Sequence, residues 1–105
     1  MVLGAFGEGR LIGVGVVVVH IRPEIAQLAY LYVTRHERAR GVGRRLSDAL
    51  ENTAREAGDT SVVVSPTPSL NTVRFYRRVG NEAMAEPLPE LLALEPEDVH
   101  MQKRL

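Results

Sequence analysis

The residues from Arg35 to Arg45, which read R-H-E-R-A-R-G-V-G-R-R, combine glycine and arginine in a pattern suited to holding an anion. They follow an apolar run, Leu28–Val33, and a helical pattern begins near Gly43. The first N–H groups of a helix have no partner inside it and lie at the positive end of its dipole, so phosphate is favoured there. Glycine lets a ligand approach the backbone, and the arginine fork matches phosphate oxygens. The stretch therefore predicts a diphosphate-binding turn.

Two familiar phosphate motifs do not fit this turn. A nucleotide P-loop requires Gly-Lys-Ser/Thr, and the dinucleotide fingerprint requires Gly-x-Gly-x-x-Gly. The order here is Arg38-x-x-Gly41-x-Gly43. The glycines and arginines alone are also compatible with an ordinary solvated loop, so the function of this turn has to be inferred together with the rest of the chain.

The composition predicts one globular domain, residues 1–105, because 45% of the residues are apolar and 25% are charged. Thirteen basic and thirteen acidic side chains cancel, which argues against nucleic acid or a membrane surface as the partner. There is no cysteine, so disulfide and thiolate chemistry are excluded and a cytoplasmic location fits. The apolar run Leu11–Val19 is too short to cross a bilayer, and we expect no metal site.

The first third of the chain predicts an antiparallel meander of three strands. Val2–Phe6 and the β-branched run Arg10–His20 are separated by a glycine turn, which favours a hairpin. Ile25–Val33 is the third strand, with Tyr30 and Tyr32 on one face. This strand is expected to lead directly into the glycine turn.

A helix and a fourth strand follow. From Gly43 the apolar residues lie along one stripe of a helix, and Gly58 supplies the stop. Ser61–Ser65 is apolar throughout its centre, which indicates a strand buried on both faces. Because a strand, a helix and a strand in succession form a right-handed crossover, this strand is predicted to run parallel to Ile25–Val33.

The last third predicts a second helix and a closing hairpin. Ser69 or Asn71 can cap the helix, and Gly80 ends it. Glu82–Glu86 is a candidate strand, and Val99–Arg104 reads as the final strand. The expected fold class is α/β (α+β), a mixed and mostly antiparallel sheet with a central parallel βαβ pair and helices on its faces.

Two segments resemble the signatures of the GNAT superfamily of N-acetyltransferases. Leu31–Val33, followed by Arg38-x-x-Gly41-x-Gly43, is similar to the acetyl-CoA signature Gln/Arg-x-x-Gly-x-Gly/Ala. Residues 71–80, which read N-x-x-R-F-Y-x-x-x-G, are similar to the second signature, in which Asn and Tyr flank the thioester. The resemblance covers roughly residues 11–105. It implies an N-acetyltransferase with acetyl-CoA as co-substrate and a small-molecule or peptide amine as acceptor.

The resemblance also implies roles for single residues. Tyr76 would protonate the departing thiolate as general acid, whereas without the family pattern it would be interpreted as a core aromatic residue beside Phe75. The main chain of Arg38–Arg45 would hold the pyrophosphate, and the pantetheine arm would lie at a splay between the two central strands. The residues implied to bind the co-substrate are Val33, Arg38, Ala39, Arg40, Gly41, Val42, Gly43, Arg44 and Asn71. The amine attacks the thioester directly, so the protein positions reactants, stabilises an oxyanion and moves protons.

The identity of the general base is left open by the sequence. Some family members place a glutamate where this chain has Gln27, and an amide cannot accept the proton. Glu24 is the candidate we put forward, with His20 and His36 as alternatives because histidine titrates in the useful range. A chain of water molecules to the solvent is a further alternative.

The N-terminus departs from the family pattern. Family members usually begin with a strand and two helices on the acceptor side, whereas this chain begins at the counterpart of the second strand. Its first strand, Val2–Phe6, is then an open edge that can pair with another copy. We therefore expect a homodimer, with an acceptor pocket that is either open or completed by the second copy.

Two other functions are compatible with the sequence. A catalytically weak CoA-binding or regulatory module would keep the glycine turn, and Gln27 and the shortened N-terminus support that reading. A nucleic-acid-binding domain would use the arginine-rich turn together with Arg74, Arg77 and Arg78, but the zero net charge argues against it. Release of CoA with a panel of amines separates an enzyme from a module.

Overall fold

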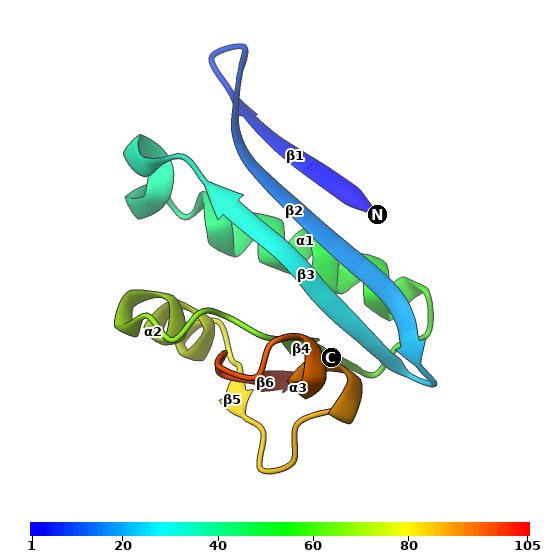
Figure 1. Ribbon diagram of the computed structural model, residues 1–105. Coiled ribbons are helices and arrows are strands. Elements are labelled where there is room, and N and C mark those ends of the chain that lie inside the picture. Colours follow the sequence, from blue (N-terminus) through cyan, green and yellow to red (C-terminus); the bar gives the residue numbers. More distant parts are fainter.

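The computed structural model describes the backbone of residues 1–105 and every side chain except those of His36, Arg38 and Ala39. Six strands form one sheet in the order β1-β2-β3-β4-β6-β5 (Figure 1). The strands are β1 (Val2–Gly7), β2 (Arg10–Arg22), β3 (Ile25–Val33), β4 (Ser61–Val64), β5 (Glu82–Ala83) and β6 (Met101–Arg104). The helices are the 3-10 helix η1 (Arg35–Arg40) and the α-helices α1 (Val42–Glu56), α2 (Leu70–Arg78) and α3 (Pro89–Leu94). Only β3 and β4 pair in parallel, which confirms the predicted mixed sheet.

The predicted meander of β1, β2 and β3 packs directly against α1. Two glycines of β2 lie beneath this helix. A Cβ on Gly13 would lie 2.9 Å from Leu46 Cδ1, and a Cβ on Gly15 would lie 2.5 Å from Leu50 Cδ1. A side chain at either position would have to displace the end of Leu46 or Leu50, so the two glycines let the helix lie close to the sheet, and Leu50 is fully buried there.

β3 and β4 are paired at only one end. The paired residues are Ile25 with Ser61, Ala26 with Val62, and Gln27 with Val63. Beyond Gln27 the two strands diverge, and β3 continues beside β2 as far as Val33 (Figure 1). The divergence leaves an opening in the middle of the sheet.

α1 and α2 cover the same face of the sheet. α1 lies behind β2 and β3 in Figure 1, and Tyr76 of α2 belongs to the same core cluster as Leu50 of α1. The N-terminus of α1 touches the middle of α2, because a Cβ on Gly43 would lie 3.3 Å from the Phe75 ring. α3 lies in front of β6, on the opposite face, where Leu91 is buried.

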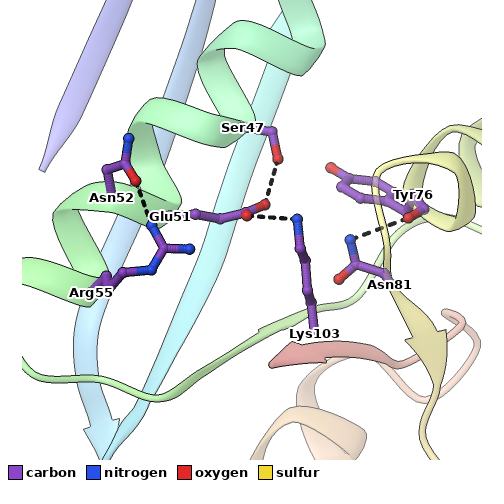
Figure 2. A network of polar contacts seen from close by, with 7 residues as sticks. All are labelled: Ser47, Glu51, Asn52, Arg55, Tyr76, Asn81 and Lys103. Atoms are coloured by element: carbon purple, nitrogen blue, oxygen red, sulfur yellow. Dashed lines mark hydrogen bonds and ion pairs between the residues drawn. The ribbon is translucent and has the colours of Figure 1, made fainter. Parts of the chain in front are cut away.

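A buried ion pair joins α1 to β6 (Figure 2). Lys103 Nζ lies 2.7 Å from Oε1 of Glu51, and Ser47 Oγ donates to Oε2 of the same carboxylate at 3.0 Å. Glu51 is 4% exposed and Ser47 is fully buried. Each carboxylate oxygen therefore has a donor, which is the condition under which a buried charge is tolerated.

Three local details differ from the sequence prediction. β3 does not lead directly into the glycine turn, because η1 intervenes and ends at Gly41. The strand predicted at residues 82–86 is only Glu82–Ala83, since Pro87 follows closely and has no N–H for a ladder. Ser69 occupies the N-cap of α2, but its side chain makes no capping hydrogen bond, and Asn71 lies inside the first turn.

Candidate functional site

The opening between β3 and β4 forms a pocket of about 440 Å³ on the face that carries α1 and α2. Its walls come from the end of β3, the start of α1 and one side of α2. The residues that line it are Leu31, Tyr32, Val33, Gly43, Asn71, Thr72, Phe75, Tyr76 and Arg78. The structure thus brings Val33, Gly43, Asn71 and Tyr76, which the sequence predicted to act together, into the wall of one pocket.

A second pocket, of about 280 Å³, adjoins the first at the same opening. Its lining residues are Gln27, Leu28, Ala29, Tyr30, Leu31, Val64, Ser65, Pro66, Thr67, Thr72, Tyr76 and Glu95. Leu31, Thr72 and Tyr76 line both pockets. Two reactants can therefore reach Tyr76 from two directions.

The N-terminus of α1 borders the first pocket at Gly43. Gly41 occupies the N-cap with φ of 76°, and there is nothing within 4 Å of the position that its Cβ would take. A glycine N-cap has no side chain with which to satisfy the amides of the first turn, so they are oriented toward an incoming anion. There is open space beside Gly41, and Gly43 packs closely against Phe75. The missing side chain at Gly41 leaves room for a diphosphate to lie against the main chain.

The surface around this turn is basic. The exposed arginines are Arg35, Arg40, Arg44 and Arg45 near the start of α1, and Arg74, Arg77 and Arg78 on α2. Arg40 Nε lies 3.7 Å from a carboxylate oxygen of Glu37, a long and exposed ion pair. The side chains of Arg38 and Ala39, which the sequence also assigned to this site, lie outside the described residues.

Tyr76 lies between the two pockets and is 7% exposed. Its ring packs edge-on against Phe75, with centroids 5.2 Å apart. Its carbonyl accepts hydrogen bonds from the backbone N–H and the side-chain amide of Asn81, at 2.8 and 3.2 Å (Figure 2). Burial raises the pKa of Tyr76 to about 12, so the hydroxyl carries its proton throughout the neutral range.

Two of the base candidates, Glu24 and His20, are absent from the described residues that line the two pockets. Glu24 is exposed at the turn between β2 and β3 and is not among the described residues that line either pocket. His20 Nδ1 lies 2.7 Å from Asp59 Oδ1. The side chain of His36 lies outside the described residues. Gln27, by contrast, lines the second pocket.

Sequence reasoning missed Thr72, which lines both pockets, and the contact of Ser65 with His100. Thr72 and Tyr76 are four residues apart, so their common side of α2 could have been found from helical spacing. Ser65 of the second pocket lies 2.9 Å, through its Oγ, from Nδ1 of His100. That contact depends on the pairing of β4 with β6, which residue spacing alone does not indicate.

A larger hollow, of about 620 Å³, lies elsewhere on the sheet. It is lined by Thr60, Ser61, Gly80, Glu82, Gln102, Lys103 and Arg104. None of these described residues belongs to the predicted site. Size alone does not indicate function, and we assign the site to the opening between β3 and β4.

Comparison with known proteins identifies the family to which this chain is similar. Residues 1–80 match the model of the acetyltransferase (GNAT) family. No curated protein matches the chain. In the part of the chain that the structure describes, the helices are too short or too polar to cross a bilayer.

Solved structures with the same fold include three acetyltransferases. The PaiA N-acetyltransferase of Thermoplasma acidophilum, in complex with coenzyme A, is 21% identical with a TM-score of 0.83, and the match covers 100% of this chain and 60% of that one. Nourseothricin acetyltransferase is 25% identical with a TM-score of 0.83, over 98% and 64% of the two chains. An IAA acetyltransferase of Bacillus cereus is 19% identical with a TM-score of 0.82, over 99% and 77%. This chain thus spans less than two thirds of the first two proteins.

Proposed function

This chain belongs to the GNAT family of acetyltransferases, and on that premise we propose that it transfers the acetyl group of acetyl-CoA to a primary amine. The observation that carries the proposal is the opening between β3 and β4, where Val33, Gly43, Asn71 and Tyr76 line one pocket. This opening leaves room for an extended chain between two strands that would otherwise pair. The PaiA structure, which holds coenzyme A in the same fold, supports the choice of co-substrate.

The start of α1 holds the pyrophosphate in this proposal. The amides of Val42, Gly43 and Arg44 donate to its oxygens, and the absence of a side chain at Gly41 leaves space for it. The exposed side chains of Arg40 and Arg44 add positive charge, and the main chain of Arg38 and Ala39 completes the turn.

Val33 and Asn71 line the first pocket, and the pantetheine arm lies against them. Tyr76 supplies a proton to the sulfur as the thioester breaks. Its raised pKa keeps the hydroxyl protonated before the reaction, and a forming thiolate nearby provides the acceptor. The amine attacks the carbonyl carbon from the second pocket, which shares Tyr76 with the first. Holding both reactants at one opening removes the entropic cost of their encounter during the chemical step.

The proposal includes a small-molecule or peptide amine as acceptor and a second copy of the chain as partner. β1 is an edge strand of the sheet, and its residues Val2 and Phe6 are 68% and 71% exposed. Unpaired strand edges with apolar side chains favour association. A cytoplasmic location, based on the lack of cysteine, completes the proposal.

A melting experiment tests the binding step. A ligand at about 100 times its dissociation constant adds roughly 2.7 kcal/mol of stability. For a domain of this size that corresponds to a rise in Tm of about 10 °C or more. We expect this rise with acetyl-CoA and its loss in Gly41→Glu, which places a negative side chain in the open space beside the turn.

A turnover experiment tests the transfer step. Wild-type protein, acetyl-CoA and a panel of primary amines are combined, and free CoA thiol is measured. Release that requires an amine supports the enzyme. A normal rise in Tm without release would instead support a CoA-binding module, and the absence of both would contradict the proposal.

A further inference from the structure

Ser65 and His100 face each other across two neighbouring strands. Val64 of β4 pairs with Met101 of β6, so the next residues along each chain, Ser65 and His100, are also opposite one another. Val64 and Met101 point into the core beneath α1. Because successive side chains alternate, Ser65 and His100 point to the other face of the sheet. There, Ser65 Oγ lies 2.9 Å from Nδ1 of His100.

The hydrogen bonds of His100 assign its tautomer. Nε2 lies 3.0 Å from the carbonyl oxygen of Glu95. A carbonyl oxygen only accepts hydrogen bonds, so Nε2 carries the proton and Nδ1 of the neutral ring has a free lone pair. The hydroxyl of Ser65 then donates to Nδ1. His100 is 7% exposed, and Ser65 is half-buried.

This pair lies beside the reacting groups. Ser65 lines the second pocket together with Tyr76 and Gln27. Gln27 pairs with Val63, and Ser65 is two residues beyond Val63 on the same face of β4. The hydroxyl of Ser65 therefore lies on the same face of the sheet as the side-chain amide of Gln27, and both line the second pocket.

We infer that Ser65 and His100 form the proton relay that takes a proton from the incoming amine. A hydroxyl that donates to an imidazole, which is itself oriented by a third group, is an arrangement suited to proton transfer. The inference rests on the proposed function, since the relay serves the acetyl transfer. It goes beyond that function by naming the base and by requiring an acceptor that arrives as an ammonium ion.

In the relay, every proton that leaves the amine has a defined acceptor. The ammonium gives one proton to Ser65 Oγ while the Ser65 hydroxyl proton passes to Nδ1 of His100, which becomes an imidazolium. The neutral amine attacks the thioester carbon, the C–N bond forms and the C–S bond breaks. Tyr76 gives its proton to the leaving sulfur and recovers one from the nitrogen of the new amide. The imidazolium returns its proton to the solvent through Ser65, so the net products are the amide, CoA thiol and one proton.

Two pairs of variants test the relay. Ser65→Ala removes the hydroxyl, whereas Ser65→Thr keeps it. His100→Gln keeps a side-chain amide near the Glu95 carbonyl but cannot take up a proton. Its control, Thr53→Ala, removes a hydroxyl on α1 that donates to the Ala49 carbonyl and lines neither pocket. Each variant is assayed for the rise in Tm with acetyl-CoA, and for kcat with two amines. One is an aliphatic primary amine, protonated at neutral pH, and the other is an arylamine, neutral at that pH.

The relay predicts a selective defect. Ser65→Ala and His100→Gln should lower kcat for the aliphatic amine by about 100-fold or more, because general base catalysis typically contributes that much. The same variants should change kcat for the arylamine only a few-fold, and should keep the acetyl-CoA shift in Tm. Ser65→Thr and Thr53→Ala should stay near wild type with both amines.

Other outcomes would overturn the inference. Equal losses with both amines would show that the pair only supports the structure, and no loss in Ser65→Ala would exclude the relay even if His100→Gln failed to fold. If the wild-type protein releases no CoA with any amine, the proposed function fails, and the relay fails with it. An active wild type with unimpaired variants would remove the relay alone.

Discussion

Tyr76 is the residue on which the proposed chemistry depends most. Tyr76→Phe removes the acidic hydroxyl and leaves the packed ring against Phe75 in place. We expect kcat to fall by about 100-fold or more, the usual contribution of a general acid, while the acetyl-CoA shift in Tm is unchanged. Steady-state kinetics and a melting curve on one preparation check both. A variant that turns over normally would show that the sulfur takes its proton from elsewhere.

The buried hydroxyl of Tyr76 also makes stability depend on pH. Its pKa is raised from 10.0 to about 12 by burial, so between these values the unfolded chain loses a proton that the folded chain keeps. The contribution of Tyr76 to the free energy of unfolding is therefore constant below pH 10. It falls as pH rises toward 12, by about 2–3 kcal/mol in total. Urea unfolding of wild type and Tyr76→Phe at pH 9 to 11.5 checks this. A parallel decline in both proteins would contradict it.

The two glycines of the turn should respond differently to alanine. Gly41 has open space around it but φ of 76°, so Gly41→Ala should cost about 1 kcal/mol through backbone strain alone. Gly43→Ala places a Cβ 3.3 Å from the Phe75 ring, a tight contact that the ring has to relieve by a small shift, and Phe75 lines the pocket. We expect Gly43→Ala to weaken acetyl-CoA binding about 10-fold or more, measured by calorimetric titration. Equal effects on binding would contradict this distinction.

At the scale of the elements, the ion pair between Lys103 and Glu51 joins β6 to α1. Lys103→Met leaves the carboxylate of Glu51 buried without its cation, and we expect a loss of about 3 kcal/mol in the free energy of unfolding. Glu90→Gln breaks the exposed pair of Glu90 with Arg22 and serves as the matched control, with a much smaller effect. Urea unfolding compares the two variants. Similar losses of unfolding free energy in Lys103→Met and Glu90→Gln would show that burial of the ion pair does not determine the cost of breaking it.

Most elements were predictable because their patterns are local. β3 was assigned as Ile25–Val33, the bounds that the structure shows, and α1 begins one residue before the predicted Gly43. These assignments follow from β-branched runs, helical stripes and glycine stops. The contact between Ser65 and His100 was not predictable, because it depends on which distant strands pair. The 3-10 helix η1 was missed because its charged sequence has no apolar period.

At the scale of the whole molecule, the meander of β1, β2 and β3 carries exposed apolar side chains. Phe6, Tyr30 and Tyr32 are 71%, 53% and 45% exposed, and β1 adds an unpaired edge. We expect a dimer in sedimentation velocity at micromolar concentration. Val2→Lys together with Phe6→Lys should give a folded monomer, because charge on an edge strand opposes pairing. A wild type that is monomeric at all concentrations would contradict the dimer.

The central claim is that the opening between β3 and β4, together with the start of α1, binds acetyl-CoA. A crystal structure of the protein soaked with acetyl-CoA tests it most directly. We expect the pyrophosphate on the amides of Val42, Gly43 and Arg44, and the thioester beside Tyr76. Density for the ligand in the 620 Å³ hollow at Lys103, or at any other surface, would contradict it.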